Sequence, residues 1–134
     1  MPAKTPGAVT TRLVTAVHDR DLEAVLALYE EDATLVVYPG MLGKGKTAIR
    51  TFYEGIFRLE GDIQHGAEAF TEAGDLTLYT AKWTIVGPMP PHLPLNRTNY
   101  HAALLRKQPA GNWLIAIDNP WGPDPPPRSE ERTL

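Results

Sequence analysis

Apolar residues recur with a helical period in the first part of the chain. Thr5 followed by Pro6 provides an N-cap and a proline at the first helical position, so we expect a helix that ends near His18. Asp19 can cap a second helix, in which apolar side chains return at spacings of three and four. These side chains are Leu22, Val25, Leu26 and Tyr29, and we expect the helix to end over residues 30–32. A third helix is predicted by the stripe of Ile49, Phe52, Tyr53, Ile56 and Phe57.

The remaining segments are rich in β-branched and aromatic residues and are interrupted by glycine and proline. Residues 33–38 predict a short strand, and residues 43–46 predict a loop. Residues 62–71 indicate a weak strand and residues 76–86 a strong one. The expected inner face of the strong strand is Thr77, Tyr79, Ala81, Trp83 and Ile85. Two helices, a strand, a third helix and four more strands predict an α+β fold, in which a curved, mainly antiparallel sheet wraps around the helices.

A single domain over residues 1–122 accounts for these elements. The chain has 134 residues, which is enough to bury a core without disulfides. Residues 87–95 are rich in proline and predict a stiff, non-helical connection. Residues 123–134 combine prolines with charged side chains, so we expect a disordered tail.

The last two strands predict a hairpin whose register decides which side chains can meet. Its arms are residues 96–107 and 112–121, and Pro109 and Gly111 suit the turn between them. A four-residue loop places His101 opposite Asp118, where an imidazole and a carboxylate can share a proton. A three-residue loop shifts the register by one, and the two side chains then leave opposite faces. The hairpin sequence leaves both registers open.

Composition and charge restrict the function classes. The net charge is −3 and no basic block is present, so we expect neither nucleic acid nor an anionic membrane as a partner. The chain has no cysteine, which excludes disulfides, thiolate metal sites and a cysteine nucleophile. No apolar run reaches membrane-spanning length, and a cytoplasmic location is the expectation. We expect His18, His65 and His92 at a helix end or in loops, without metal-ligand spacing, and therefore neither a metal nor a cofactor.

Two segments of the chain resemble known proteins. Residues 21–34, followed by residues 43–53, are similar to the opening of SnoaL-like and ketosteroid-isomerase-like proteins of the nuclear transport factor 2-like superfamily. Residues 106–122 resemble the ending of an uncharacterised SnoaL-like branch. The resemblance covers roughly residues 8–122 and implies a cone, in which three helices close a strongly bent sheet over an apolar cavity. It also implies a homodimer, which is common in the family.

The resemblance argues against ketosteroid isomerase activity. Those enzymes use a carboxylate base and an oxyanion hole made by a tyrosine and a protonated aspartate. The resemblance maps these three groups to Val37, Leu13 and Ala103, all of which are apolar. A supporting tyrosine of the family is matched by Tyr53.

The resemblance also bears on the hairpin register. In the family, the faces that carry Ala103 and Asp118 share the cavity, so His101 and Asp118 are expected to point inward together. The hydrophobic pattern instead favours Trp113, Ile115 and Ile117 as the inner face of the last strand. The two expectations are compatible if His101 and Asp118 face the cavity and the apolar face of Trp113, Ile115 and Ile117 is the outer one, buried in a homodimer. We therefore expect a homodimer.

These considerations lead to a predicted site and two function classes. The predicted catalytic residues are His101 and Asp118. The predicted ligand-binding residues are Leu13, Val17, Tyr29, Val37, Tyr53, Tyr79, Trp83 and Asn99. One class is a cofactor-independent isomerase, cyclase or dehydratase that acts on a small apolar, ring-bearing metabolite by acid–base catalysis, and SnoaL-like cyclases similarly use Asp and His in the cavity. The other is a non-catalytic module that binds a small ligand or dimerises.

Overall fold

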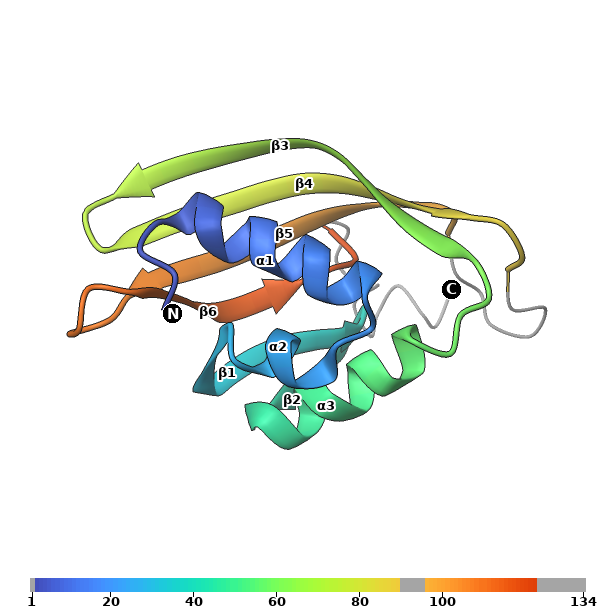
Figure 1. Ribbon diagram of the computed structural model, residues 1–134, viewed down its shortest axis with the longest axis horizontal. Coiled ribbons are helices and arrows are strands. Elements are labelled where there is room, and N and C mark those ends of the chain that lie inside the picture. Colours follow the sequence, from blue (N-terminus) through green and yellow to red (C-terminus); the bar gives the residue numbers. More distant parts are fainter. Residues whose placement is uncertain (1, 90–95, 123–134) are drawn as a thin grey trace, which may run out of the picture.

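Three helices lie across one curled sheet of six strands in the computed structural model, which describes residues 2–89 and 96–122 (Figure 1). The helices are α1 (Pro6–His18), α2 (Leu22–Leu26) and α3 (Gly45–Ile56). The strands are β1 (Tyr29–Tyr38), β2 (Met41–Lys44), β3 (Asp62–Ala73), β4 (Leu76–Val86), β5 (Thr98–Lys107) and β6 (Trp113–Asn119). The predicted tail, and His92 in the proline-rich connection, lie outside the described residues.

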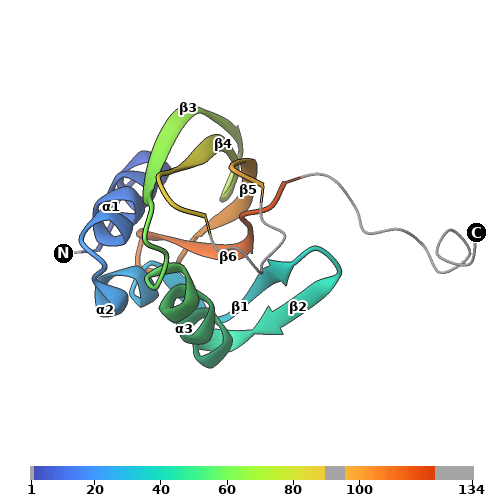
Figure 2. The same cartoon turned by 90° about the vertical axis from the view of Figure 1, so that its right-hand side faces the viewer.

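The sheet is mixed and does not close. Its strand order is β2-β1-β6-β5-β4-β3, and the neighbours are antiparallel except for the parallel pair β1–β6. Figure 2 shows how the sheet curls, with β3 and β4 arching toward α1 at one end and β1 and β2 beside α3 at the other. The predicted α+β fold with a bent, mainly antiparallel sheet is confirmed.

The first helix follows its sequence signals, and the second does not. The Thr5 hydroxyl accepts a hydrogen bond from the Ala8 N–H at 3.1 Å, as expected for the cap of α1. Asp21, rather than Asp19, caps α2. Tyr29 begins β1 instead of lying in this helix, because the Leu28 carbonyl accepts a hydrogen bond from the Ile115 N–H at 2.8 Å and ties the segment to the sheet. The predicted helix over residues 22–29 is therefore too long.

Two strand predictions have different outcomes. The inner face of β4 is the predicted one, because its odd-numbered residues from 77 to 85 are buried and their neighbours face outward. The predicted loop over residues 43–46 is wrong, because residues 41–44 form β2 and pair with β1. Gly43 permits this close approach: a Cβ there would lie 2.9 Å from side-chain atoms of both Val37 and Ala48.

The hairpin of β5 and β6 has the three-residue loop. The predicted consequence, that His101 and Asp118 leave opposite faces of the sheet, does not follow. The Gln108 N–H donates to the Asn112 carbonyl at 2.7 Å, and Gly111 takes a φ of 91°. Near the turn, Leu105 pairs with Ile115. The next pair is Leu104 with Ile117, so Ala116 is one extra residue on β6 and forms a β-bulge.

The bulge reverses the alternation of side chains along β6. Before it, Trp113 and Ile115 face the core, as the hydrophobic pattern predicts. After it, Asp118 faces the core as well, on the same side as His101. The bulge thus lets Trp113, Ile115 and Asp118 all face the core, whereas Ile117, the third residue of the expected apolar face, points outward.

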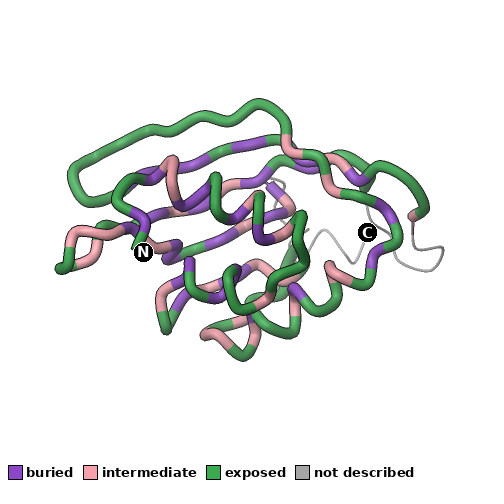
Figure 3. Tube along the Cα trace, viewed as in Figure 1, coloured by how far each residue is buried: buried purple, intermediate pink, exposed green. Residues whose placement is uncertain are grey.

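The bulge also changes the expected dimer surface. Trp113 and Ile115 belong to the main core cluster, so they cannot form the predicted interface. Ile117 alone of the three is exposed, at 45%. In Figure 3 the edge strand β3 is exposed along most of its length, whereas β4 and β5 alternate between buried and more exposed positions.

Candidate functional site

A buried histidine–aspartate pair lies where β5 and β6 face the helices. His101 is 9% exposed and Asp118 is fully buried. The His101 Nε2 atom is hydrogen-bonded to Asp118 Oδ1. Ala103, not His101, is directly opposite Asp118 in the ladder, so the contact is diagonal. An ionised Asp118 requires the imidazole proton on Nε2, and Nδ1 has no hydrogen-bond partner among the described residues.

Two tyrosines complete the environment of the carboxylate. The Tyr29 hydroxyl donates to Asp118 Oδ2, and the Tyr29 and Tyr53 hydroxyl oxygens are 2.6 Å apart. Because the only hydroxyl proton of Tyr29 points to Asp118, Tyr53 must donate to Tyr29. Each oxygen of the carboxylate therefore has a donor, which offsets the cost of burying it.

Both tyrosines are held in their neutral form. Burial raises the pKa of Tyr29 well above its ordinary value, and the charge of Asp118 raises it further. Burial and Asp118 also raise the pKa of Tyr53, although the hydrogen bond with Tyr29 opposes the shift. Hydroxyl groups of this kind act as hydrogen-bond donors rather than as bases near neutral pH.

A small pocket gives access to the two ends of this hydrogen-bonded chain. Its volume is about 40 Å³, and both Tyr53 and His101 border it. Tyr29 and Asp118 are not among its lining residues and lie behind it. The other lining residues are Leu13, Val17, Phe52, Ile56, Ile63, His65, Trp83 and Pro120. The site thus combines a mostly apolar wall with a small number of polar groups.

The predicted ligand-binding residues fall into two groups. Leu13, Val17, Tyr53 and Trp83 border the pocket. The other four do not border it and make structural contacts instead: Tyr29, Val37, Tyr79 and Asn99. Tyr79 places its ring edge-on to His101 with centroids 5.4 Å apart. The Asn99 side-chain amide donates to the Asn96 carbonyl at 2.9 Å, and the Val37 carbonyl accepts from the Trp121 indole N–H at 2.8 Å.

His65 is the pocket residue that the sequence analysis misplaced. It lies on β3 and pairs with Trp83 on the inner side of the sheet, not in a loop. The ladder then shifts, and Glu68 pairs with Ala81, so residues 66 and 67 form a second bulge. A glycine inside a strand, here Gly66, is the sequence signal that could have indicated this bulge.

Aromatic rings close one end of the site. The Trp121 ring lies 5.9 Å from that of Trp83 and 5.6 Å from that of Tyr38. The Trp83 indole N–H donates to the Pro120 carbonyl at 2.6 Å. These contacts fix the end of β6 immediately after Asp118.

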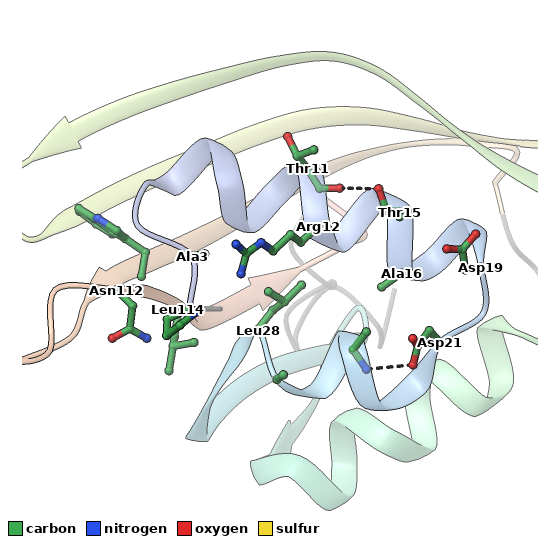
Figure 4. A pocket seen from close by; sticks show the side chains of 14 residues that line it. Ala3, Thr11, Arg12, Thr15, Ala16, Asp19, Asp21, Leu28, Asn112 and Leu114 are labelled. Carbon is green, nitrogen blue, oxygen red and sulfur yellow. Dashed lines mark hydrogen bonds between the residues drawn. The ribbon is translucent and has the colours of Figure 1, made fainter.

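A larger pocket lies elsewhere, on the outer side of α1. It has a volume of about 690 Å³ and lies between α1, α2 and the start of β6 (Figure 4). Arg12, Asp19 and Asp21 contribute charged groups, and the rest of the wall is largely apolar. Histidine and tyrosine are absent from its lining within the described residues, so we place the chemistry at the smaller pocket, where proton-transfer groups converge.

The described ranges contain neither a candidate metal site nor a candidate membrane-spanning helix. Residues 2–89 and 96–122 hold no group of three or more histidine, cysteine, aspartate or glutamate side chains that could bind a metal ion. No helix in these ranges is both long and apolar enough to cross a bilayer.

Several solved structures share the fold. A protein from Shewanella frigidimarina, provisionally described as a ketosteroid isomerase, is 18% identical with a TM-score of 0.71, over 84% of this chain and 91% of that one. A protein from Streptomyces avermitilis, provisionally described as a dehydratase of the NTF2-like family, is 19% identical with a TM-score of 0.64, over 84% and 90%. A calcium/calmodulin-dependent protein kinase type II association domain from Thiobacillus denitrificans, also a provisional description, is 14% identical with a TM-score of 0.69, over 91% and 99%. At these identities the likeness shows the fold alone, which is NTF2-like.

The family assignment comes from the sequence. A search of curated proteins gives no match. The family model described as a SnoaL-like domain matches residues 10–105, which includes His101 and ends before β6 and Asp118. The chain therefore belongs to the SnoaL-like domain family.

Proposed function

We propose that this chain is a cofactor-independent acid–base catalyst that acts on a small, apolar, ring-bearing metabolite as an isomerase, cyclase or dehydratase. The observation that carries the proposal is the hydrogen bond between His101 and the buried carboxylate of Asp118 beside a pocket that His101 itself borders. A histidine oriented by a carboxylate beside a pocket is an arrangement that general acid–base catalysis uses.

Each polar group has a distinct role in this proposal. His101 exchanges the proton through Nδ1, because Nε2 is occupied by Asp118. Asp118 orients the imidazole of His101. The negative charge of Asp118 also stabilises the positively charged imidazolium that forms when His101 takes up a proton. Tyr53 borders the same pocket and can turn its hydroxyl to a substrate oxygen, which stabilises negative charge that develops there. Ketosteroid isomerisation by the family's own mechanism is not proposed, because Val37, Leu13 and Ala103 stand at its key positions.

The pocket constrains the ligand. A volume of about 40 Å³ is close to the share of one water in the liquid, about 30 Å³, so it holds the reacting end of a molecule and not a whole ring. The rest of a ring must contact the apolar side chains around it, such as Phe52 and Ile63, and displace some of them. This favours a substrate that is apolar apart from one reacting carbonyl or hydroxyl group.

The test uses simple carbonyl compounds as probes. Cyclohexanone, tetralone and their β-hydroxy derivatives are incubated with the protein in D₂O, and proton NMR follows α-hydrogen exchange, isomerisation and loss of water. We expect catalysis of at least one process, reduced by about 100-fold or more in His101→Gln and Asp118→Asn. His18→Gln, at an exposed helix end, is the control and keeps full activity. Equal rates in the wild type and both site variants contradict the proposal.

A second candidate function, dimerisation, is favoured by the outer face of the sheet. Leu78 of β4 pairs with Leu104 of β5, which pairs with Ile117 of β6, so three apolar side chains form a row across the strands. Leu78 and Ile117 are 47% and 45% exposed, and Tyr100 on the same face is 58% exposed. A second copy of this chain, related by a two-fold axis, can cover such a row with its own.

Sedimentation at micromolar concentration tests the dimer. We expect the wild type to sediment as a homodimer and Ile117→Asp as a monomer, because the charge is placed in the centre of the row. Leu42→Asp, which changes an exposed apolar residue on the β1–β2 hairpin, away from this row, is the control and remains dimeric. A wild-type monomer rules the dimer out without affecting the proposed chemistry.

A further inference from the structure

Two bulges place titratable side chains on the inner side of the sheet, beside the two histidines that border the pocket. On β6, the bulge at Ala116 brings Asp118 to the inner side, behind His101. On β3, the bulge at residues 66 and 67 lets both His65 and Glu68 pair with inner-side residues of β4. A regular strand sends residues three apart to opposite faces. The bulge on β6 therefore allows both Ile115 and Asp118 to face inward, and the bulge on β3 allows both His65 and Glu68 to do so.

His65 faces the pocket without a structural hydrogen bond. It borders the same 40 Å³ pocket as His101 and is only partly buried. Among the described residues neither of its ring nitrogens has a hydrogen-bond partner. Because His65 is only partly buried and borders the pocket, its ring nitrogens are accessible to a ligand there.

The surroundings of His65 favour its neutral form. Burial lowers its pKa, the charge of His101 lowers it further, and Glu68 opposes the shift. Glu68 in turn accepts a hydrogen bond from the Tyr79 hydroxyl at 3.1 Å. The pocket is therefore bordered by two imidazoles with different neighbours. His101 is hydrogen-bonded to a buried carboxylate, whereas His65 has no hydrogen-bond partner in the described part of the chain and lies near the exposed carboxylate of Glu68.

We propose that His65 is a second catalytic residue, a base that removes a carbon-bound proton, and that with His101 as the acid it dehydrates a β-hydroxy carbonyl compound. This inference rests on the proposed function and narrows it to one reaction class. The two histidines border one pocket, so a single bound molecule can touch both. Elimination of water requires a base and an acid together, which this arrangement supplies.

The proposed reaction balances without a cofactor. His65 takes the proton from the carbon next to the carbonyl, and the electron pair of that C–H bond forms the new C=C bond. The C–O bond to the β-hydroxyl breaks, and the hydroxyl leaves as water after it receives a proton from His101. His65 ends protonated beside Glu68, and His101 ends neutral. Transfer of one proton from His65 to His101, through water, restores the starting state.

Leaving groups of different basicity separate the two roles. A hydroxyl needs a proton in order to leave, whereas a p-nitrophenolate does not. The probes are β-hydroxycyclohexanone and β-(p-nitrophenoxy)cyclohexanone, and the readouts are the absorbances of the enone and of nitrophenolate. Wild type, His65→Gln, His101→Gln and the control His18→Gln are compared.

The proposal predicts a specific pattern of rates. His65→Gln loses about 100-fold or more with both probes, because each needs the base. His101→Gln loses as much with the hydroxy ketone but less than about tenfold with the nitrophenoxy ketone. His18→Gln matches the wild type. Added imidazole restores part of the nitrophenolate release in His65→Ala, an effect that the loss of a merely structural residue does not give.

Each other pattern overturns a defined statement. Full activity of His65→Gln on both probes, or no rescue of His65→Ala by imidazole, removes His65 from the mechanism and leaves the role of His101 intact. A penalty in His101→Gln that is the same for both probes contradicts its role as the acid. Absence of wild-type catalysis on both probes overturns the dehydration. If the α-hydrogen exchange of simple ketones is absent as well, the proposed function also fails.

Discussion

The two bulged strands of this sheet occupy contrasting places, and the contrast divides the site into a fixed half and an open half. β6 lies between β1 and β5 in the sheet, and Asp118 after its bulge is fully buried with a donor on each oxygen. β3 is an edge strand and largely exposed, and His65 before its bulge is only partly buried and has no hydrogen bond among the described residues. A β-bulge inside the sheet is therefore associated with a side chain fixed by hydrogen bonds, Asp118. A β-bulge on the edge strand is associated with a side chain, His65, that is free to adapt to a ligand.

The contrast predicts its largest effect when each carboxylate is removed. In Asp118→Ala, the Tyr29 hydroxyl and the His101 N–H lose their acceptor in the core, so we expect a loss of about 3 kcal/mol in the free energy of unfolding. In Glu68→Ala on the edge strand, we expect less than about 1 kcal/mol. Urea unfolding of both variants measures the difference. Equal losses contradict the division into two halves.

The tyrosines that donate to the two carboxylates provide a gentler comparison. Tyr29→Phe keeps the ring but leaves Asp118 Oδ2 without its donor, and we expect a loss of about 1–2 kcal/mol. Tyr79→Phe removes a hydrogen bond to the exposed Glu68, and we expect about 0.5 kcal/mol. The same unfolding measurement serves both variants. A larger loss in Tyr79→Phe than in Tyr29→Phe reverses the assignment.

The fixed half also predicts sensitivity to alkali. The pKa values of Tyr29 and Tyr53 are raised in the folded state, whereas an unfolded tyrosine ionises at about pH 10. Their contribution to stability is therefore complete below about pH 10 and is lost as the pH rises toward the folded-state values. Thermal unfolding from pH 8 to 11 should show this fall, and Tyr29→Phe/Tyr53→Phe should flatten it. An unchanged slope in the double variant counts against buried neutral hydroxyls.

The open half predicts the smallest effect, on the acid side. The pKa of His65 is lowered in the folded state, so below about pH 6.5 the unfolded chain binds a proton that the folded chain does not. Stability therefore falls as the pH decreases from about 6.5 through the folded-state pKa, and above that range His65 contributes no slope. The difference between the wild type and His65→Gln isolates this contribution, since other acidic groups titrate in both. A difference that grows toward alkaline pH instead contradicts the sign.

The sequence predicts the parts of the fold that local pattern determines. Strict alternation identified β4 and its inner face, and Pro109 and Gly111 identified the turn of the last hairpin. The cap of α1 followed from Thr5 and Pro6. In these places the local preference and the tertiary structure agree.

The sequence fails where packing decides between two local solutions. Tyr29 continues the helical spacing of α2, but hydrogen bonds to β6 draw its segment into β1. The bulge on β6 has no local marker, because it arises when Ile115 and Asp118 must both face inward. The sequence predicted the contact between His101 and Asp118 only for a four-residue loop. The structure instead forms it with a three-residue loop and a bulge at Ala116. His65 was misplaced because its strand alternates poorly.

The pairing of His101 with Asp118 is the central claim, and the histidine side chains themselves can report on it. Long-range ¹H–¹⁵N correlation spectra of ¹⁵N-histidine-labelled protein identify which ring nitrogen of His101 carries the proton and how strongly it is hydrogen-bonded. We predict a proton on Nε2 with a low-field resonance that exchanges slowly with water, and loss of that resonance in Asp118→Asn. A His101 protonated on Nδ1 alone, or an Nε2 resonance unchanged by Asp118→Asn, contradicts the account.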